Sequence, residues 1–462
     1  MAQTGDKCFE PQLDGTIYSA RKNLRPFSVP PLEEYTRLLG LERIERLLKA
    51  AERLKGLRIL EMNATARGGG VAEMLFSAIP FMNDLGLETE WNIITGNPEY
   101  YECTKVLHNL LQGKRGFFTQ DMVKTYDETI NRCAAGDSSI GEADVVLIHD
   151  PQPAGLSRYV KRPGQVWAWR CHIDIEEYIL QANPGLETFI SNLLEPYDAA
   201  IFTAAHYVIT KWRLPKFLIP PFIDPLSEKN RDLSEAEINA VLDKYGIDRQ
   251  IPTIVQVGRF DPWKGLERTI EAFKVLRKKR ECQLLLAGGL AADDPEGVRV
   301  LSRIRESTKD DQDIHILNLS LEDRLENWRE VNALQRAADI IMQPSTREGF
   351  GLVITEALWK GKPVIGADVG AIPLQLRDGD TGYFYRTPRK TARIMARLLD
   401  NPAAAAAMGK NGKDYVTQHF LMPDRIADWL MAVNLLVEGR LDKEACGDAI
   451  ISFHPWFKLG KR

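Results

Sequence analysis

Short apolar runs alternate with longer stretches of mixed polarity along most of the chain. After the first of these runs, apolar side chains return at helical spacing from Val71 to Met82. Strands that alternate with helices are typical of a parallel sheet covered by helices on both faces. The first half is therefore predicted to be a doubly wound α/β domain. Its predicted strands are 57–62, 91–95, 144–149, 165–170 and 199–203.

The second half repeats this alternation with a set of strands of its own. Helices are predicted over 234–245 and 352–360. A second doubly wound domain follows from this pattern. The last apolar stripe, from Ile426 to Leu436, also has helical spacing and is expected to pack back on the first domain. The predicted strands are 253–257, 283–287, 314–317, 340–343 and 363–366.

Prolines mark the junction between the two halves. Pro220, Pro221 and Pro225 lack a backbone N–H and hold the chain extended, as in an interdomain linker. Ligands of open α/β folds bind beyond the C-terminal ends of the strands, so the two domains are expected to face each other across a cleft. The predicted parts are residues 1–220 with an N-terminal extension through residue 40, 221–425, and a C-terminal helical segment 426–462. The extension is expected either to cap the first domain or to form a homodimer contact.

Length and composition exclude several classes of protein. A chain of 462 residues exceeds what one core usually supports, which agrees with two domains. Its net charge is −4, with 27% charged and 44% hydrophobic residues, so nucleic acid and acidic membrane surfaces are not expected partners. No apolar run approaches the ~18 residues of a membrane span, and the N-terminus lacks the pattern of a signal peptide. We expect a cytoplasmic protein with a small-molecule partner.

Cysteine and acidic residues give no sign of a metal site. The six cysteines form no C-x-x-C pair, which argues against a zinc site and a disulfide framework and favours reduced thiols. The pairs Asp293-Asp294 and Asp310-Asp311 lie in polar segments and are interpreted as solvated loop carboxylates, not as a magnesium site. Neither a metal nor another cofactor is expected.

Two carboxylates flank a glycine-rich turn where the strand 340–343 passes into the helix 352–360. Glu348 precedes Gly349-Phe350-Gly351, and Glu356 lies within the helix. Unpaired N–H groups and the positive end of the helix dipole favour an anion or hydroxyl groups at such a junction. Because seven residues separate the two carboxylates, they can hold different parts of one elongated ligand. A phosphate-containing sugar derivative fits this description.

Two cations follow the first strand of the second half. Arg259 and Lys264 lie just beyond the strand end, and a helix is expected after them. A departing diphosphate gains negative charge, which these two side chains can stabilise without a metal. Basic residues in loops are usually only solvated, but the carboxylate motif in the same domain favours a site.

A glycine-rich turn also follows the first strand of the first half, over 62–70. Gly68, Gly69 and Gly70 allow a ligand to approach the backbone, and Asn63 supplies a polar group. The dinucleotide fingerprint requires a further glycine where Glu73 stands, which argues against a dehydrogenase. A tight turn without a ligand is the alternative interpretation.

Two histidines end strands of the first half. His149 is followed by Asp150, and His172 stands after the strand 165–170. A strand-end histidine facing a cleft can bond a substrate hydroxyl, and a satisfied structural imidazole is the alternative for each. Neither has a neighbouring Cys or Glu at the spacing of metal ligands, so a metal site is not expected.

Taken together, these segments resemble a known enzyme family. The second-half segments are similar to the donor motifs of the retaining glycosyltransferases of family 4, which have the GT-B fold of two facing Rossmann-like domains. The likeness covers almost the whole chain, and the spacing of the two carboxylates is specific. In the first half, 68–73, 104–113 and 149–153 more narrowly resemble the trehalose glycosyltransferring synthases of that family. The second-half segments are Gly258-Arg259-Phe260, Lys264-Gly265, Pro344-Ser345, Glu348 to Leu352 and Glu356-Ala357.

The resemblance implies a retaining transfer of glucose from ADP- or UDP-glucose to free glucose, which forms trehalose in a reversible reaction. It implies that Arg259 and Lys264 hold the diphosphate and that Glu356 holds the ribose hydroxyls. His172 matches the family histidine that contacts the donor sugar near the reacting carbon. The implied catalytic set is His172, Arg259, Lys264 and Glu348. The implied donor-binding set is Gly349, Phe350, Gly351, Leu352, Val353 and Glu356, and the implied acceptor-binding set is Asn63, Gly69, Gly70, His149 and Asp150.

The stereochemistry of the implied reaction limits the mechanism. Retention needs either two inversions through a carboxylate nucleophile or attack from the face of the leaving group. Glu348 and Glu356 are already assigned to hydroxyl binding, so front-face transfer is the hypothesis. The alternatives are a glycoside hydrolase, a trehalose phosphorylase, a family 4 transferase with another acceptor, and a nucleotide-sugar-binding module without activity. The base preference and the physiological direction stay open, with 318–321 as the segment expected near the base.

Overall fold

The structure is a computed structural model that describes residues 15–24, 29–66, 69–136, 139–289, 295–441, 449–454 and 457. These residues form two compact units. The first unit contains the described residues up to Pro221 and again from Met422, and the second unit contains Phe222–Leu421. The chain therefore passes from one unit to the other twice. Each unit is built around one sheet.

The first unit contains an eight-stranded sheet in the order β1-β3-β2-β4-β5-β6-β7-β14. All strand pairs are parallel except β1 with β3, so the predicted doubly wound parallel sheet carries one antiparallel edge strand. β1, β7 and β14 span only two or three residues, which is too short for a periodic pattern to appear in the sequence. The strands are β1 (Ile17–Ser19), β2 (Arg58–Asn63), β3 (Glu88–Ile94), β4 (Val145–His149), β5 (Val166–Cys171), β6 (Ala199–Phe202), β7 (Lys216–Leu218) and β14 (Ile450–Ile451).

Helices cover this sheet, and two of its inner strands are buried from end to end. All residues of β4 are buried, as are those of β6, because a parallel sheet is covered on both faces. Trp91, Trp167 and Trp169 are almost completely buried and fill the space between sheet and helices. The helices are α1 (Arg21–Leu24), α2 (Leu32–Leu39), α3 (Leu41–Glu52), α4 (Gly70–Asp84), α5 (Pro98–Leu111), α6 (Gln120–Gly136), α7 (Ser157–Val160), α8 (Glu177–Gln181), α9 (Pro184–Leu194) and α17 (Met422–Val437).

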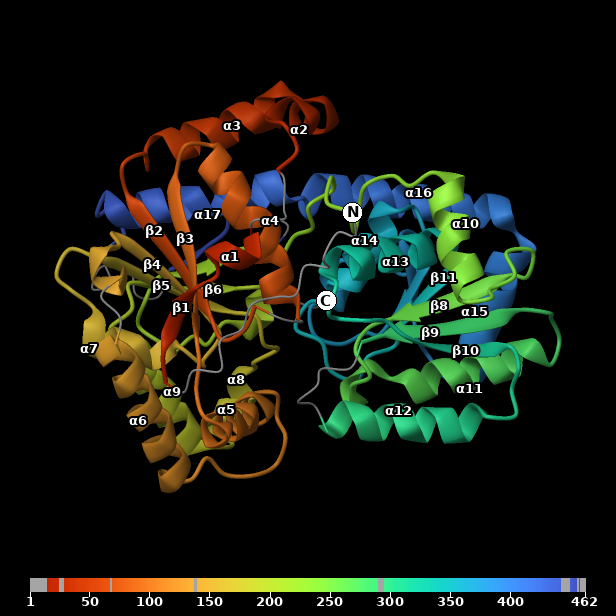
Figure 1. Cartoon of the computed structure of the whole chain (residues 1–462), viewed down its shortest axis with the longest axis horizontal. Helices are drawn as coiled ribbons and strands as arrows, with labels where there is room; N and C mark the ends of the chain where they lie inside the picture. The colour runs from red at the N-terminus through yellow and green to blue at the C-terminus, as the bar shows by residue number, and fades with distance from the viewer. Residues whose placement is uncertain are drawn as a thin grey trace, which may run out of the picture. The chain divides into compact units, whose positions relative to one another are not determined.

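The C-terminal helix α17 packs on α3, near the start of the chain (Figure 1). Asn434 Nδ2 donates to the carbonyl of Ala50 at 2.9 Å. Arg43 Nε donates to the Asp424 carboxylate at 2.9 Å. Most of α17 is buried, which is expected for a helix whose apolar stripe lies against a neighbouring element. α17 thus ties the end of the chain to the first unit.

The second unit contains a six-stranded sheet in the order β10-β9-β8-β11-β12-β13. All of its strand pairs are parallel, and numbered within the unit the order is 3-2-1-4-5-6, a common doubly wound arrangement. The sequence pattern predicted five of these strands but not β13, which has only three residues. The strands are β8 (Thr253–Val257), β9 (Gln283–Gly288), β10 (Ile314–Asn318), β11 (Ile340–Gln343), β12 (Val364–Gly366) and β13 (Gly382–Phe384).

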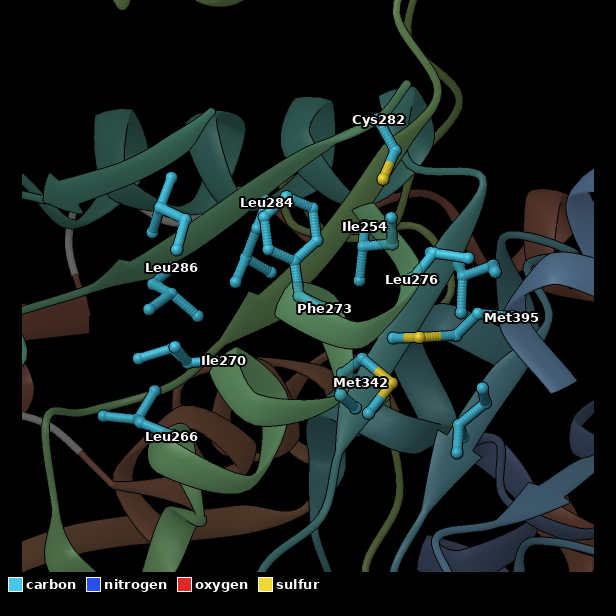
Figure 2. Packing of buried hydrophobic residues seen from close by; sticks show 14 of the residues in the cluster. Ile254, Leu266, Ile270, Phe273, Leu276, Cys282, Leu284, Leu286, Met342 and Met395 are labelled. Atoms are coloured by element: carbon cyan, nitrogen blue, oxygen red, sulfur yellow. The ribbon is translucent and has the colours of Figure 1, made fainter. Parts of the chain in front are cut away.

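In the second unit, α11 and α12 lie on one face of the sheet, and α13 and α14 lie on the other (Figure 1). The core on the first of these faces joins strands and helices (Figure 2). Phe273 of α11 and Met395 of α15 pack with Ile254, Leu284 and Met342 of three neighbouring strands. The helices of this unit are α10 (Glu235–Lys244), α11 (Leu266–Arg277), α12 (Pro295–Thr308), α13 (Arg324–Ala337), α14 (Leu352–Trp359), α15 (Pro388–Asp400) and α16 (Pro402–His419).

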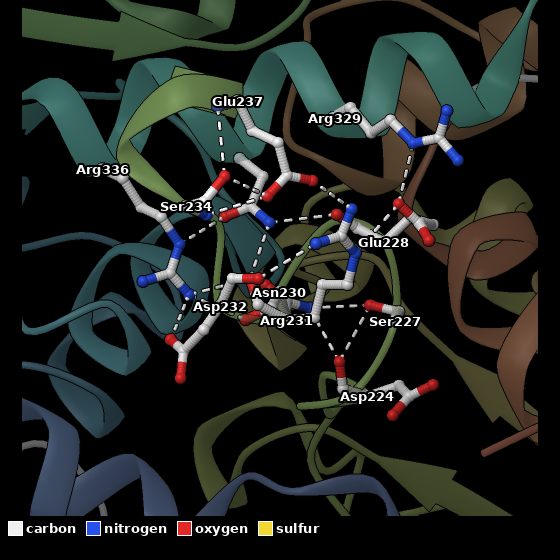
Figure 3. Close-up of polar contacts among 11 residues, drawn as sticks. Asp224, Ser227, Glu228, Asn230, Arg231, Asp232, Ser234, Glu237, Arg329 and Arg336 are labelled. Atoms are coloured by element: carbon white, nitrogen blue, oxygen red, sulfur yellow. Dashed lines mark hydrogen bonds and ion pairs between the residues drawn. The ribbon is translucent and has the colours of Figure 1, made fainter. Parts of the chain in front are cut away.

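The segment that follows the prolines is docked onto the second unit by polar contacts (Figure 3). Arg329 Nε of α13 donates to the Glu228 carboxylate at 2.8 Å. Arg231 Nη2 donates to Glu237 Oε1 at 2.8 Å, and Ser234 with Glu237 forms the capping box that begins α10. The segment 228–237 at the start of the second unit is therefore held by defined contacts and is not a free linker.

Each sheet has one point at which its strand order reverses. In the first unit, β2 has β3 on one side and β4 on the other. In the second unit, β8 has β9 on one side and β11 on the other. Consecutive crossovers therefore leave in opposite directions at these points, and ligands of doubly wound sheets bind outside the carboxyl ends of such strands. The predicted site residues follow these strands in the sequence.

Two further expectations concern cysteines and membrane spans. Cys103, Cys133, Cys171 and Cys282 are free and buried, whereas Cys8 and Cys446 lie outside the described residues. Among the described helices, none has the combination of length and apolarity that crossing a bilayer requires.

Candidate active site

Two turns of the second unit are locked together beyond β8 and β11. Gly265 has φ 67°, and a Cβ there would lie 2.2 Å from the carbonyl oxygen of Pro344, so only glycine fits without movement of the backbone. The Thr346 N–H donates to the carbonyl of Trp263 at 2.7 Å. This close approach brings Lys264, at the end of a short 3-10 helix (Pro262–Lys264), beside the carboxylate motif.

Lys264 and Glu348 form the centre of the second-unit site. Lys264 Nζ lies 3.0 and 2.8 Å from the two carboxylate oxygens of Glu348. Gln343 Nε2 and Ser345 Oγ donate to the same carboxylate at 3.2 and 3.0 Å. Burial alone raises the pKa of Glu348, but the charge of Lys264 and these hydrogen bonds hold that pKa below its ordinary value. Glu348 is therefore an ionised, oriented acceptor at neutral pH.

This pair stays within reach of solvent, and it adjoins a helix N-terminus. The side chains of Lys264 and Glu348 keep 21% and 11% of their exposure. Gly351, with φ 88°, is the N-cap of α14, whose first N–H groups have no partner within the helix. Leu352 and Val353 form the first turn. The arrangement can take up an anion through Lys264 and the helix end, and sugar hydroxyls through Glu348.

Arg259 lies on the same turn as Lys264 but is held more loosely. Its side chain is 51% exposed, and its guanidinium lies 3.5 Å from the carboxylate of Asp261. A cation at this position can turn toward a diphosphate, because the exposed pair contributes little stability to the fold.

Phe350, within the predicted donor motif, is a core residue. Its ring packs on Phe420 with centroids 5.5 Å apart, and its carbonyl accepts a 2.5 Å hydrogen bond from Gln375 Nε2. Gln375 in turn accepts from Thr355 Oγ1 of α14 at 2.6 Å. The side chain of Phe350 therefore anchors the glycine turn, and the donor contacts expected from the backbone of Phe350 and Gly349 stay a prediction.

Glu356 is more deeply buried than Glu348 and is held by other partners. Lys229 Nζ lies 2.8 Å from one carboxylate oxygen, and Gln335 Nε2 donates to the other at 3.1 Å. Burial raises the pKa of Glu356, but Lys229 and then Lys360 overcome this effect and hold it below its ordinary value. A ribose hydroxyl would have to share the carboxylate with these partners or displace one of them.

In the first unit, the predicted acceptor residues begin with the turn between β2 and α4. Gly69 has φ 83° and caps α4, Gly70 begins the helix, and the space where a Cβ of Gly69 would point is open. Asn63 is buried: its Nδ2 donates to the Thr65 carbonyl at 2.7 Å, and its Oδ1 accepts from Trp91 Nε1 at 2.9 Å. The amide of Asn63 thus holds the turn. Arg67 and Gly68 lie outside the described residues.

Beyond β4 and β5, the two predicted histidines meet. His149 Nδ1 and His172 Nε2 are 2.9 Å apart, and the other ring nitrogen of His149 lies 2.8 Å from Glu61 Oε2. His149 is buried, whereas His172 remains partly exposed. Both ring nitrogens of His149 are therefore engaged, and an acceptor sugar could reach that ring only by breaking one of these contacts.

Asp150 braces the same loop through an unusual backbone conformation. Its φ is 61°, and its carboxylate accepts from the backbone N–H of His172 at 2.8 Å. Trp169 Nε1 donates to its carbonyl at 2.9 Å. Burial raises the pKa of Asp150 to about 7, although the His172 N–H and then the charge of Arg170 oppose this shift.

Both histidines are neutral at neutral pH. Burial lowers the pKa of His149 below its ordinary value, although Glu61 opposes this shift. Burial, then the positive charge of Arg170, lowers the pKa of His172 well below its ordinary value. The first-unit site therefore presents hydrogen-bonding groups, not a cationic imidazole.

The structure thus brings Lys264 together with Glu348, and His149 together with His172 and Asp150. Sequence reasoning did not single out Glu61, Arg170 or Lys229. For the first two a signal was present, because each is a charged residue inside an otherwise apolar strand. Lys229 lies in a polar segment that carries no such signal.

Acidic residues outside these clusters form no apparent metal centre. Within the described ranges, no group of three or more His, Cys, Asp or Glu side chains could hold a metal ion. Asp311 pairs with Arg277 at the surface of the second unit, and the pair Asp293-Asp294 lies outside the described residues.

Comparison with known proteins identifies the family. A family model described as the N-terminal domain of trehalose synthase matches residues 61–209, and one for glycosyl transferases group 1 matches residues 238–415. A trehalose synthase from Thermococcus litoralis is 42% identical over 409 residues, which cover 87% of this chain and 96% of that protein. The chain belongs to the trehalose synthase family. The predicted resemblance to trehalose synthases is confirmed, and membership of that family makes the chain a glycosyltransferase.

More distant relatives extend this picture. A trehalose phosphorylase from Pleurotus sajor-caju is 30% identical over 477 residues, which cover 89% of this chain but 62% of that longer protein. The solved structure of an α,α-trehalose-phosphate synthase (UDP-forming) from Burkholderia xenovorans, in complex with glucose-6-phosphate, superimposes with a TM-score of 0.65. The superposition covers 82% of this chain and 100% of the Burkholderia xenovorans chain, and the two sequences are 14% identical. At this identity the likeness concerns the fold, and it confirms the predicted GT-B architecture of this trehalose synthase family member.

Proposed function

We propose that the protein transfers glucose from ADP- or UDP-glucose to free glucose with retention of configuration and so forms trehalose. The observation that carries the proposal is the contact of Lys264 with Glu348 where the second sheet reverses its strand order, beside the N-terminus of α14. Membership of the trehalose synthase family supports glucose as the sugar. The same residues in a chain without this relationship would indicate only a sugar diphosphate.

The second-unit residues divide the donor among them. Lys264 and Arg259 neutralise the charge that develops on the diphosphate as its bond to glucose breaks. When the diphosphate binds, Lys264 exchanges part of its contact with Glu348 for phosphate oxygens, and Glu348 turns its remaining acceptor capacity to hydroxyls of the donor glucose. The N–H groups of Gly349, Phe350 and Gly351 supply donors from the backbone.

The deeper carboxylate supplies the ribose contact. Glu356 is ionised and oriented by Lys229, so it can accept hydrogen bonds from two neighbouring hydroxyl groups while this ion pair remains. This role does not depend on the base of the nucleotide, which is consistent with either ADP- or UDP-glucose as the donor.

The first-unit residues receive the acceptor and orient the reacting sugar. The open backbone at Gly69 and Gly70 admits a glucose molecule, and the Asp150 loop borders the partly exposed His172. His172 contributes a neutral imidazole near the reacting carbon.

Retention follows from front-face attack in this proposal. Both carboxylates of the donor motif are held by lysine and by neutral side-chain donors, which favours hydroxyl binding and disfavours a nucleophilic role. The departing phosphate takes the proton of the acceptor hydroxyl, and Lys264 stabilises that phosphate. A glycosyl-enzyme trapped with a slow fluorinated donor, and located by peptide mass spectrometry, would contradict this step.

The decisive experiment combines several donors with one acceptor. The protein is incubated separately with ADP-glucose and UDP-glucose in the presence of ¹³C-labelled glucose, and the products are identified by NMR. An α,α-1,1-linked disaccharide containing one labelled ring is the expected product. Hydrolysis of trehalose without any nucleotide would indicate a glycoside hydrolase. Tight donor binding without turnover across many acceptors would indicate a binding module.

A second candidate, trehalose phosphorylase, is favoured by the fungal relative described above. Inorganic phosphate would then occupy the place of the nucleotide diphosphate beside Lys264 and Arg259. The two functions separate in the breakdown of trehalose. A requirement for nucleoside diphosphate supports the transferase, and a requirement for inorganic phosphate with release of glucose 1-phosphate supports the phosphorylase.

A further inference from the structure

A buried carboxylate of the first unit has no role in the function proposed above. Glu61 lies in the middle of β2, with only 3% of its surface exposed. β2 and β4 are parallel, with Glu61 opposite Leu147, so that His149 two residues later lies on the same face of the sheet. Arg170 of β5 lies opposite His149. Three polar side chains from three adjacent strands therefore share one face at the strand ends.

These groups form a line of hydrogen bonds that ends at His172. Glu61 Oε2 lies 2.8 Å from His149 Nε2, and His149 Nδ1 lies 2.9 Å from His172 Nε2. The two rings have centroids 5.2 Å apart and planes 20° from parallel. Arg170 supplies the positive charge that a buried carboxylate requires, and its guanidinium is itself anchored near the carbonyl of Ile219 at 3.3 Å.

The line has a direction when both imidazoles are neutral. A carboxylate only accepts hydrogen bonds, so His149 carries its proton on Nε2 and its Nδ1 is an acceptor. His172 must then donate from Nε2, and its own Nδ1 is left without a proton. A neutral imidazole in this tautomer accepts a hydrogen bond at Nδ1.

We propose that Glu61 is a positioning residue that acts through His149 to hold His172 in the Nε2–H tautomer, so that Nδ1 accepts a hydrogen bond from a hydroxyl group of the sugar. The nature of the hydroxyl rests on the proposed function, whereas the tautomer does not. His172 is suited to this role because it is the partly exposed end of the line, and Glu61 and His149 are its buried part.

Among the described residues, the charged groups that shift the pKa values of the two histidines are Glu61 and Arg170. Glu61 and Arg170 lie inside the sheet, and Asp150 holds the backbone N–H of His172. Burial lowers the pKa of both histidines, which keeps the two imidazoles neutral at neutral pH. A fall in pH that protonates His172 would add a proton at Nδ1 and turn the acceptor into a donor.

The test joins a direct view of the tautomer to kinetics. The protein is labelled with ¹⁵N-histidine, and the ring nitrogens of His149 and His172 are assigned by loss of their signals in His149→Gln and His172→Gln. Wild-type His172 is expected to show a protonated Nε2 and an unprotonated Nδ1. In Glu61→Gln, whose amide can either donate or accept, we expect a mixture of tautomers. Glu90→Gln, an exposed glutamate on the neighbouring β3, is the matched control and should leave both signals unchanged.

The kinetic arm uses the same variants. Loss of one oriented hydrogen bond in the transition state is expected to lower kcat of Glu61→Gln by about tenfold. KM for the donor is expected to stay within about twofold, because ground-state binding relies mainly on the second unit. Glu90→Gln is expected to keep the wild-type kcat.

Several outcomes overturn the inference. It fails if wild-type His172 is protonated at Nδ1, a result that does not depend on whether Glu61→Gln folds. It also fails if Glu61→Gln keeps one tautomer and the wild-type kcat. An absence of trehalose formation by the wild-type protein, together with the expected NMR spectra, would instead contradict the proposed function while leaving the tautomer assignment intact.

Discussion

Both units place polar groups where the strand order of the sheet reverses, but different interactions hold these groups. In the second unit, carboxylates beyond the reversal of strand order are paired with lysines: Glu348 with Lys264, and Glu356 with Lys229. In the first unit, the exposed end of the cluster is a neutral imidazole, His172, and its charged member is buried. One site presents ion pairs, and the other presents a neutral imidazole oriented by a buried carboxylate.

This difference matches the ligands that each unit is proposed to bind. A diphosphate can replace a carboxylate as the partner of a lysine, so the ion pair keeps a cation ready without leaving a buried charge unpaired. A glucose molecule carries no charge and presents only hydroxyl groups, which are distinguished by donor and acceptor direction. Pre-oriented neutral groups serve that purpose, and the contrast leads to four predictions.

The ion-pair side of the comparison is tested most strongly at Lys264. Lys264→Ala and Glu348→Ala are each expected to lower turnover by more than tenfold, a loss of at least ~1.4 kcal/mol of transition-state stabilisation. Initial rates of trehalose formation from a nucleotide-glucose and glucose measure the effect. Lys278→Ala, at the exposed end of α11, is the control and should keep the wild-type rate. Wild-type rates in either site variant would show that the donor site lies elsewhere.

The two ion pairs should differ in their importance for folding. Glu356→Ala removes the buried carboxylate that forms an ion pair with Lys229 and attracts the charge of Lys360, and we expect a loss of roughly 3–5 kcal/mol in the free energy of unfolding. Glu348→Ala should cost less, because Lys264 can turn to solvent. Hydrogen exchange measured by mass spectrometry on second-unit peptides gives both values. If both variants lose the same free energy of unfolding, the Glu356–Lys229 pair is no more important for folding than the Glu348–Lys264 pair, and the proposed distinction fails.

Mild acid should separate the two units by stability. Burial lowers the pKa of His149 and that of His172, so below about pH 6.5 the unfolded chain binds protons that the folded first unit excludes, and stability falls with pH. Asp150 opposes this trend, because its pKa is raised from 3.8 to about 7 and its folded form gains a proton first. As the pH falls, the two histidines lower the free energy of unfolding and Asp150 raises it. The net change from these three groups is therefore up to about 1.4 kcal/mol per pH unit.

The second unit provides the internal control for this measurement. The pKa values of Glu348 and Glu356 are lowered, so their contribution is fully present above the ordinary value of 4.5 and is lost only as the pH falls through the lower folded values. Hydrogen exchange corrected for its intrinsic pH dependence should therefore show first-unit peptides losing protection between pH 6.5 and 5.5 while second-unit peptides around the motif keep theirs. The opposite ranking would contradict the assignment of neutral histidines.

The smallest effect is expected from metal removal. If Lys264 and Arg259 stabilise the leaving diphosphate by themselves, treatment with EDTA followed by gel filtration should change the initial rate by less than about twofold. Loss of activity that added Mg²⁺ restores would show that Lys264 and Arg259 supply only part of the charge stabilisation. The comparison between the units would then have to include a bound cation.

Much of the fold could be predicted from the sequence because the signals are local. β8 and β11 have the predicted bounds, since each is an apolar run between polar segments. The antiparallel β1 and the short β13 could not be predicted, because a strand of three residues has no measurable period. β1 and β13 lie at the edges of their sheets, where the neighbouring strand has unpaired backbone N–H and C=O groups that a short segment can bond.

The donor motif and Lys264 were also visible as local patterns, whereas the direct pairing between them was not. The pairing of Glu348 with Lys264 joins residues 84 positions apart. It depends on the fit of Gly265 against the Pro344 carbonyl, a contact that no spacing announces. Likewise, no sequence pattern singled out Lys229. It contacts Glu356 only because the folded chain places the start of the second unit beside α14.

By itself, the sequence determined that the chain forms two doubly wound sheets with glycine turns and charged residues after particular strands, because hydrophobic period and turn chemistry act over a few residues. Only the tertiary structure decided what each polar group does. Burial and distance, which arise from strands brought together across the chain, made His149 and Glu61 an internal line to His172, and made Glu348 and Glu356 members of ion pairs. A side chain's charge state and hydrogen-bond direction depend on its neighbours in space, and those neighbours are distant in sequence.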